Sequence, residues 1–378
     1  MIKLSKLCTV LSELYPPQSA ESWDNPGLLV GRGASEIHRA ILALELTPNV
    51  LEEARKNHAE LIITHHPFIF KPLNALTDST PEGALLHALI QENIALYAAH
   101  TNFDAAPHAI AEKLARDLGI SSYSALLPHQ PYAAYKIVVF APRDAAQAVS
   151  RAMHDAGAGC VGHYRDVSFR CDGHGYFTGD ETTHPSIGIP ERPEIVEETK
   201  IEMVVSQRDL KRVVEAMKAA HPYEEAAYDV FKIEAPVHGI SDMYGFGTIG
   251  KLPKIMTLRD FAQHLKATWQ LEHLRISNIA PEKPIEKVAI LNGSGAKYLK
   301  DCIRMGADAY ITGDCGHHDF DLAMRYNIAL IDAGHFDTEK YIPALMRNAI
   351  QEALKSAFPT DEFSLQVAAL MENSIQYY

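Results

Sequence analysis

The chain has 378 residues, which is too long for one ordinary hydrophobic core and predicts two or three domains. Its apolar content of 47%, charged content of 22% and formal net charge of -13 are typical of a soluble globular protein without a broad nucleic-acid or membrane-surface footprint. The five cysteines are scattered and include no Cys-x-x-Cys pair, which predicts reduced thiols in a cytoplasmic protein. The N-terminus lacks the apolar segment of a signal peptide, and no run is long enough to span a membrane.

Residues 1–128 alternate between helical and strand patterns, which is the signature of a layered α/β domain. The apolar spacing predicts, in order, helix 4–15, a strand starting at 28, strand 39–46, helix 49–57, strand 61–64, helix 82–92, strand 94–99 and helix 107–119.

Residues 129–237 have a different pattern, with two βαβ halves that predict an independent, inserted ferredoxin-like α+β domain. The expected elements are strand 136–140, helix 143–156, strands 167–171, 175–178 and 200–205, helix 207–220 and strand 226–233. The stretch 182–193 is rich in loop residues.

The α/β alternation resumes in residues 238–378. We expect helix 258–269, strand 287–291, helix 297–305, strand 309–312, helix 319–326, strand 328–332 and one long helix from about 334 to 355. This part echoes the first, because Asn-Ile-Ala-Leu occurs at 93–96 and again at 327–330, each followed by a histidine with an acid four residues later. The echo predicts two similar α/β half-domains that face one metal cleft.

Metal-binding side chains follow the predicted strand ends. They are His65, His66, His100, Asp104, His335 and Glu339. Ligands lie beyond the carboxyl ends of strands in open α/β sheets, and imidazole is the commonest metal ligand. Four histidines and two carboxylates are too many for one tetrahedral ion and suit two divalent ions such as Zn, Mn or Fe.

Each of these residues also has a simpler interpretation. His65 and His66 could be ordinary loop histidines, and His335 could be a surface residue at a strand end. Asp104 could be a helix N-cap, and Glu339 could interact with its own helix dipole. His100 could orient a ligand without binding metal. A further group, Asp314 with His317 and His318, could serve the substrate side of the cleft, provide hydrogen bonds, or belong to a solvated loop.

Five motifs together resemble the NIF-three-like family, whose members are often labelled GTP cyclohydrolase 1 type 2 homologues. They are SWDNPGL at 22–28, THHP at 64–67, HTNFD at 100–104, ITGD at 311–314 and GHFDTE at 334–339. The insert, with HPYEE at 221–225, resembles the PII/CutA-like domain of the longer bacterial members.

The resemblance implies a dinuclear metal site inside a ring-shaped homohexamer. The family's ligands would fall on His65, His66, Asp104, His335 and Glu339, with Glu339 bridging, while His100 would become a supporting residue. The chain departs from the family pattern at Glu45, where an aspartate is usual, and at 315–318, where CGHH is unusual. Both departures put the substrate in doubt.

The leading functional hypothesis is a metal-dependent hydrolase of a nucleotide or related heterocycle. The family label implies ring opening of GTP with formate release, and His100 or His318 could transfer a proton, since an imidazole titrates near neutral pH. The expected partner is a small molecule and neither nucleic acid nor a membrane. The alternatives are a non-catalytic metal-binding protein whose insert senses a ligand, and a scaffold for protein interactions.

Overall fold

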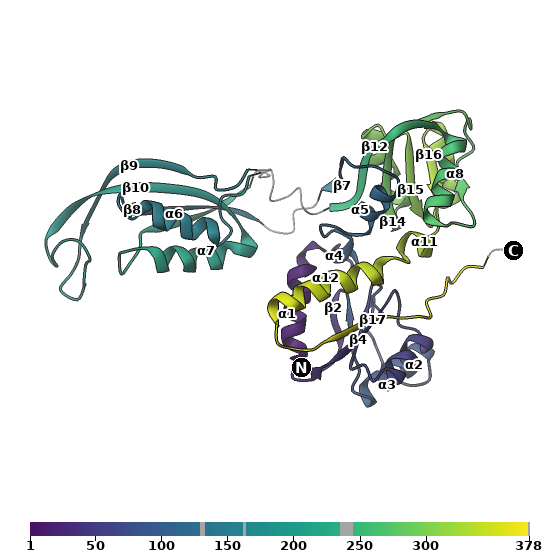
Figure 1. Ribbon diagram of the computed structural model, residues 1–378, viewed down its shortest axis with the longest axis horizontal. Coiled ribbons are helices and arrows are strands. Elements are labelled where there is room, and N and C mark those ends of the chain that lie inside the picture. Colours follow the sequence, from purple (N-terminus) through teal and green to yellow (C-terminus); the bar gives the residue numbers. More distant parts are fainter. Residues whose placement is uncertain (129–132, 162–163, 235–244, 377–378) are drawn as a thin grey trace. The chain divides into compact units, whose positions relative to one another are not determined.

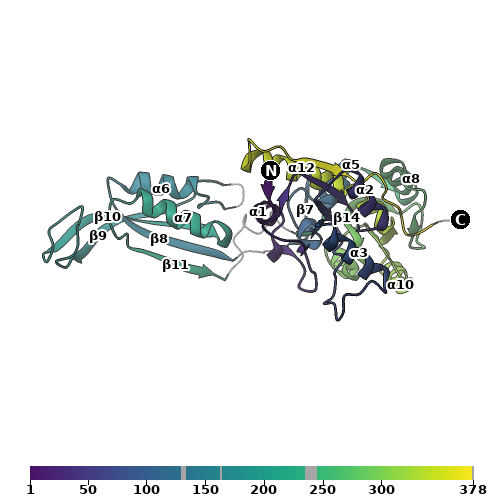
Figure 2. The same cartoon turned by 90° about the horizontal axis from the view of Figure 1, so that it is seen from below.

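The structure of the protein is a computed structural model that describes residues 1–128, 133–161, 164–234 and 245–376 (Figures 1 and 2). It has two compact units: Met1–His129 with Tyr244–Tyr378, and Gln130–Met243. Our predicted domain boundaries at 128/129 and 237/238 touch residues outside the described ranges. The mixed α/β class expected from the sequence is confirmed.

The first unit contains a five-stranded sheet in the order β17-β4-β5-β6-β2. Its strands are β2 (Gly27–Val30), β4 (Arg39–Ala43), β5 (Leu61–Thr64), β6 (Ala95–Ala98) and β17 (Ser364–Val367). The four from β17 to β6 are parallel, and β2 is an antiparallel edge. The N-terminal region also contains α1 (Leu4–Leu14), α2 (Pro48–Lys56), α3 (Pro81–Gln91), α4 (Thr101–Asp104), α5 (Ile110–Asp117), the 3₁₀ turn η1 (Pro17–Ser19) and the pair β1 (Ile2–Lys3) and β3 (Glu36–Ile37).

A second, six-stranded sheet in this unit has the order β13-β16-β15-β14-β12-β7. Its strands are β7 (Tyr123–Pro128), β12 (Gly245–Thr257), β13 (Arg275–Ile276), β14 (Pro284–Ser294), β15 (Ala309–Gly313) and β16 (Ala329–Asp332). The central three, β14, β15 and β16, are parallel. The accompanying helices are α8 (Leu258–Trp269), η2 (Ala296–Tyr298), α9 (Leu299–Arg304), α10 (His317–Arg325), α11 (His335–Glu339) and α12 (Ile342–Ala357).

The strand alternation explains how both sheets share one core. Leu61 and Ile63 of β5 enter the same buried cluster as Ile311 of β15, whereas Ile62 and Tyr310 point to separate clusters on the opposite faces. The shared core also includes α1, α5, α8 and α12, and Figure 1 shows α1 and α12 side by side over the first sheet. Both sheets are therefore covered on two faces, which is expected for the mainly parallel first sheet. The second sheet is mixed, because β7, β12 and β13 pair antiparallel with their neighbours.

The second unit has the element order β8 (Ala134–Pro142), α6 (Ala146–Asp155), β9 (Phe169–Thr178), β10 (Pro193–Ser206), α7 (Gln207–Ala220) and β11 (Tyr228–Ile233). Its antiparallel sheet has the order β11-β8-β10-β9. The helices α6 and α7 pack on this sheet through a buried cluster that includes Val149, Met153, Val213 and Met217. This unit therefore has a hydrophobic core of its own.

Several predicted elements differ from the structure, and two of the differences have a clear physical cause. The expected strands 167–171 and 175–178 form one strand, β9, because pairing with β10 along its whole length outweighs the glycines that suggested a break. A Cβ at Gly175 would lie 2.1 Å from Glu198 Oε2, so the glycine makes room for that carboxylate. The expected last helix is two helices, because Pro343 is accepted only in the first turn of α12.

The sequence reasoning also missed strand β12 (Gly245–Thr257). This strand contains Pro253 and a register shift between Lys251 and Met256, and Gly247 has a φ of +67°. Glycine and proline are depleted in regular strands, so local signals concealed a strand that tertiary pairing stabilises.

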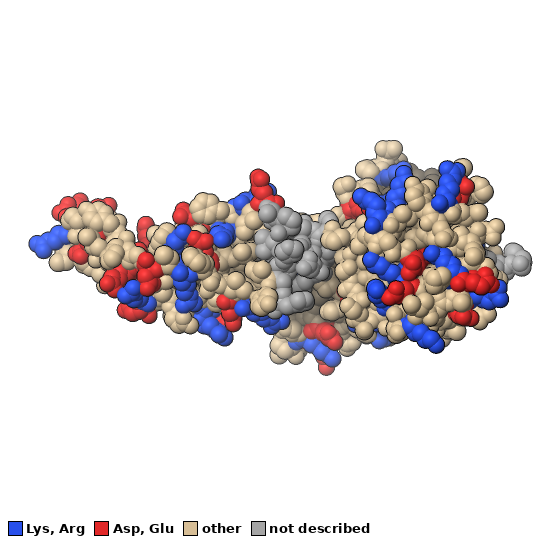
Figure 3. Space-filling model, turned by 90° about the horizontal axis from the view of Figure 1, so that it is seen from above, with Lys and Arg blue, Asp and Glu red and all other residues tan. Residues whose placement is uncertain are grey.

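The surface and the cysteines agree with the bulk composition. On the face in Figure 3, basic and acidic side chains are interspersed over both units. All five cysteines are free thiols in this structure. No helix within the described ranges is both long and apolar enough to cross a bilayer.

Candidate metal centre

The first two histidines are placed by an extension of β5. The backbone N–H of His65 donates to Ala43 O (3.1 Å) and that of His66 to Leu44 O (2.9 Å), so the ladder with β4 continues past the last residue of the strand. Pro67 follows and has no N–H to continue the pattern. Both histidines are therefore held by backbone hydrogen bonds at the carboxyl end of a central parallel strand.

Two short helices supply the other residues. Helix α4 follows β6 directly; His100 is its N-cap and Asp104 is its last residue. Helix α11 follows β16 of the second sheet; His335 is its first residue and Glu339 is its last. In both helices the two residues are four apart, and residues at i and i+4 lie on the same face. Each helix thus presents an imidazole and a carboxylate on one side.

The five predicted ligands lie close together. His65 Nε2 lies 3.8 Å from Asp104 Oδ2 and 3.8 Å from Glu339 Oε1. On the other side of Glu339, Oε2 lies 3.1 Å from His66 Nε2 and 3.0 Å from His335 Nε2. The two oxygens of Glu339 therefore face different imidazoles.

Each imidazole is oriented through its Nδ1 atom. His65 Nδ1 lies 2.9 Å from Ala99 O, and because a carbonyl only accepts, this nitrogen carries the proton. The other three Nδ1 atoms contact carboxylates: His66 with Glu45 (3.2 Å), His100 with Asp24 (2.8 Å) and His335 with Asp314 (2.6 Å). Metal-binding histidines characteristically use the second ring nitrogen in this way, which fixes the tautomer and leaves Nε2 for the ion.

The residues fit a metal ion by the chemistry of their donor atoms. His65 Nε2 is buried and has no hydrogen-bond partner among the described residues, although a buried polar atom normally has one. Two sets have ligand atoms within 4.8 Å of one another: His65, His66 and His100, and His66, His335 and Glu339. Nitrogen and carboxylate oxygen atoms in this arrangement can hold a borderline divalent cation.

The buried charges of the cluster shift the pKa values of its histidines and of Glu339. Burial by itself would lower the pKa of His66, but hydrogen bonds to Glu339 and Glu45 raise it to about 10. Burial likewise opposes the effect of Glu339 and Asp314 on His335, whose pKa rises to about 9. The three histidines hold the pKa of Glu339 well below its usual value despite its burial. The raised pKa values favour protonated His66 and His335, and a cation that binds these two imidazoles would displace those protons.

Asn292, at the end of β14, is a site residue that the sequence reasoning missed. Its side-chain amide donates to Asp104 Oδ1 (2.9 Å) and to Glu339 Oε1 (3.0 Å), and so links the two carboxylates. An asparagine after a strand carries no signal of its own, because the contact depends on two distant segments.

The next residue, Gly293, allows the close approach of Glu339. Its φ is +59°, and a Cβ on it would lie 2.4 Å from Glu339 Oε1. Only a residue without a side chain leaves this carboxylate in place.

The two predicted proton-transfer residues lie in different surroundings. His100 lines the same hollow as His66, His335 and Glu339. His318 is exposed on α10 with its ring 5.6 Å from that of His317, and it is not among the described residues that line this hollow. Its role stays a prediction.

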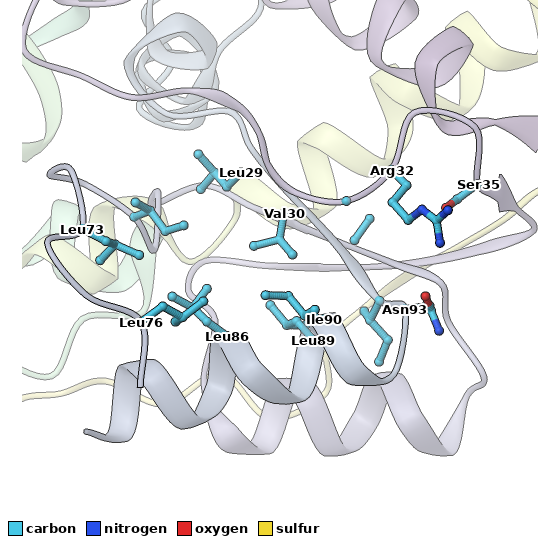
Figure 4. Close-up of a pocket in the computed structure, with 14 residues that line it drawn as sticks. Leu29, Val30, Arg32, Ser35, Leu73, Leu76, Leu86, Leu89, Ile90 and Asn93 are labelled. Carbon is cyan, nitrogen blue, oxygen red and sulfur yellow. The ribbon is translucent and has the colours of Figure 1, made fainter. Parts of the chain in front are cut away.

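A hollow of about 740 Å³ opens beside the cluster, which is a suitable size for a small-molecule substrate. Its other walls include Phe70 and the C-terminal segment 370–375. A second hollow of about 380 Å³ lies elsewhere, between α3 and the segment 29–35 (Figure 4). Its walls are mainly leucine and isoleucine, and none of the residues lining it belongs to the cluster. The first hollow is therefore the one relevant to metal chemistry.

Comparison with known proteins reveals similarity along nearly the whole chain. A family model described as "Duf34/NIF3 (NGG1p interacting factor 3)" matches residues 2–373. A protein of Halalkalibacterium halodurans named "GTP cyclohydrolase 1 type 2 homolog" is 36% identical over 95% of this chain and 94% of its own. A Staphylococcus aureus protein of the same name is 32% identical over 99% of this chain and 98% of its own.

Solved structures give the same picture of the fold. A Bacillus cereus protein related to NIF3 matches with a TM-score of 0.90 and 32% identity, covering 99% of both chains. A Staphylococcus aureus protein matches with a TM-score of 0.75 and 28% identity, over 100% of this chain and 99% of its own.

Proposed function

Because the chain belongs to the Duf34/NIF3 family, we propose that it binds two divalent metal ions and hydrolyses a nucleotide or a related heterocycle. The shared name "GTP cyclohydrolase 1 type 2 homolog" makes GTP the first substrate to test, with ring opening and formate release as the expected reaction. Zn, Mn and Fe are the ions that this mixture of nitrogen and oxygen donors favours.

The observation that carries the proposal is the convergence on Glu339. Its Oε1 faces the buried, unpartnered Nε2 of His65, and its Oε2 faces His66 and His335. We therefore assign one ion to His65 and Asp104 and the other to His66 and His335, with Glu339 shared between them. Shared carboxylates offset the charge of paired ions in two-metal hydrolases.

The protein residues supply orientation and proton transfer. When bound, divalent ions would act as Lewis acids and make water nucleophilic near neutral pH. Asp24 holds His100 at Nδ1, so the opposite nitrogen of this ring is available to exchange a proton with a substrate in the hollow. The side-chain amide of Asn292 donates hydrogen bonds to Asp104 and Glu339 and so fixes the two carboxylates relative to each other.

The test is to load the purified protein with Zn, Mn or Fe, add GTP and measure formate. Glu339→Gln keeps the size of the side chain but removes the shared charge, so we expect loss of bound metal and of turnover. Glu352→Gln, at an exposed position of α12, is the matched control and should behave as the wild type. Metal retention without turnover of GTP or of a wider panel of nucleotides, phosphoesters and amides would refute the hydrolase.

A regulatory, non-catalytic role is the second candidate, and the separate core of the second unit favours it. We propose that this unit is an inserted ferredoxin-like, PII/CutA-like domain, which its strand order β11-β8-β10-β9 supports. We also propose two similar half-domains in the first unit, on the evidence of the sequence echo, and a homohexameric ring, on the evidence of the family resemblance. Light scattering would test the ring.

A further inference from the structure

Two exposed aromatic side chains lie beside the candidate metal centre. Trp23 is 46% exposed and Phe70 is 43% exposed, although large aromatic side chains usually bury most of their surface. Their ring centroids lie 5.7 Å apart with an interplanar angle of 48°. The other tryptophan, Trp269, is fully buried. Trp23 therefore has a ring surface that the protein's own packing does not use.

This aromatic pair is connected to the reaction centre by direct contacts. The Trp23 ring centroid lies 6.0 Å from that of His100, and His100 lies 5.1 Å from His65 and 5.4 Å from His66 by the same measure. Phe70 and His100 both line the hollow that contains Glu339. A planar group stacked on Trp23 or Phe70 would therefore lie next to His100 and the hollow that contains Glu339.

A cation lies next to the exposed tryptophan. Lys297 Nζ is 5.3 Å from the Trp23 ring centroid and 4.7 Å from that of Tyr298, and its side chain is 53% exposed. Its ammonium lies 4.0 Å from a carboxylate oxygen of Glu21, and this carboxylate already accepts a hydrogen bond from Tyr298 Oη at 2.6 Å. The Lys297 ammonium donates no hydrogen bond within the described part of the chain and so can pair with an anion.

We propose that Trp23 and Phe70 form a stacking platform for the base of a purine nucleotide, and that Lys297 pairs with its phosphate. This inference rests on the proposed function, because it places the base at the hollow of the metal cluster. Every base has an aromatic face, and removing a stacking side chain typically weakens binding by about 5- to 150-fold. The platform also explains how a nucleotide binds without a glycine-rich phosphate loop in the sequence.

The two tryptophans make the platform directly measurable. Since Trp269 is buried, a ligand stacked on Trp23 changes the fluorescence of the exposed tryptophan alone. We expect GMP to quench wild-type emission and to leave Trp23→Phe emission unaffected. In calorimetric titrations, Trp23→Leu should weaken GMP binding about 5-fold or more, and Trp23→Phe should restore most of it. Lys297→Gln should weaken binding of GMP but not of guanosine.

The matched control is Phe169→Leu, which removes an exposed aromatic ring in the other unit and should leave GMP binding unchanged. Thermal melting of each variant checks that it is folded. Equal GMP affinity in the wild type and a folded Trp23→Leu variant, or no quenching by GMP, overturns the platform. GMP binding that depends on Trp23 without any turnover of GTP refutes the hydrolase and leaves the platform intact. Undiminished GTP turnover in Trp23→Leu refutes the platform alone.

Discussion

Replacing Gly293 with alanine should damage the metal centre through one identifiable contact. The new Cβ would lie 2.4 Å from Glu339 Oε1 and 3.3 Å from His335 Nε2, so Glu339 must move. The backbone has a φ of +59°, a conformation that costs a residue with a side chain about 1–2 kcal/mol. The substitution therefore has two effects, conformational strain and displacement of a ligand.

Gly306→Ala separates these two effects. Gly306 has a φ of +70°, but a Cβ on it would meet no atom within 4 Å. After the metal has been removed, Gly306→Ala should lose about 1–2 kcal/mol of unfolding free energy in urea, and Gly293→Ala should lose at least as much, because Glu339 must also move. Only Gly293→Ala should also weaken metal binding, by about 10- to 100-fold, which is the usual effect of disturbing the residues around a metal site.

The assay is a competition titration against a chelator, with metal content measured by mass spectrometry. An affinity for Zn equal to that of the wild type in Gly293→Ala would show that Glu339 does not hold metal in this position. Equal weakening in Gly293→Ala and Gly306→Ala would attribute the loss to backbone strain and refute the reasoning from the contact.

Three further results are expected. Asp314→Asn keeps the size of the side chain that contacts His335 Nδ1 but removes its charge, so Zn affinity should fall about 10-fold in a chelator titration. The control Asp321→Asn, on the partly exposed helix α10, should not change Zn affinity. Met217→Ala should cost the second unit about 2–5 kcal/mol in urea unfolding without changing the metal content, because its core is separate; coupled loss of metal would contradict this. Removing metal with a chelator should lower the melting temperature. Adding Zn at about 100 times its Kd should restore about 2.7 kcal/mol of unfolding free energy. An unchanged melting curve would argue against a metal site that is specific to the folded state.

Much of the fold could be predicted from local patterns. Strand β5 coincides with the predicted 61–64, and β6 and β16 lie within the predicted 94–99 and 328–332, because each is a short apolar run bounded by breakers. Strands β7 and β12 were missed. They pair with each other although the whole second unit separates them in the sequence, and their own residues give no local signal of that long-range pairing.

The candidate site divides in the same way. The predicted metal ligands were recognisable because histidines and acids follow strand ends. The residues that orient them were not recognisable, except Asp314, for which hydrogen bonding was one of the predicted roles. Asp24 reaches His100 from a loop 76 positions away, and Asn292 reaches Asp104 over 188 positions. Such contacts leave no periodic signal in the sequence.

By itself, the sequence of this protein determined short buried strands such as β5, β6 and β16 and the ionisable side chains that follow them, because both depend on short-range periodicity and residue chemistry. Only the tertiary structure decided that two sheets share one core and bring His65 and His335 to opposite oxygens of Glu339. It also decided that Trp23 remains exposed beside them. The physical reason is that burial, hydrogen-bond partners and the distance between charges are properties of the packed chain, which places residues far apart in sequence within a few ångströms.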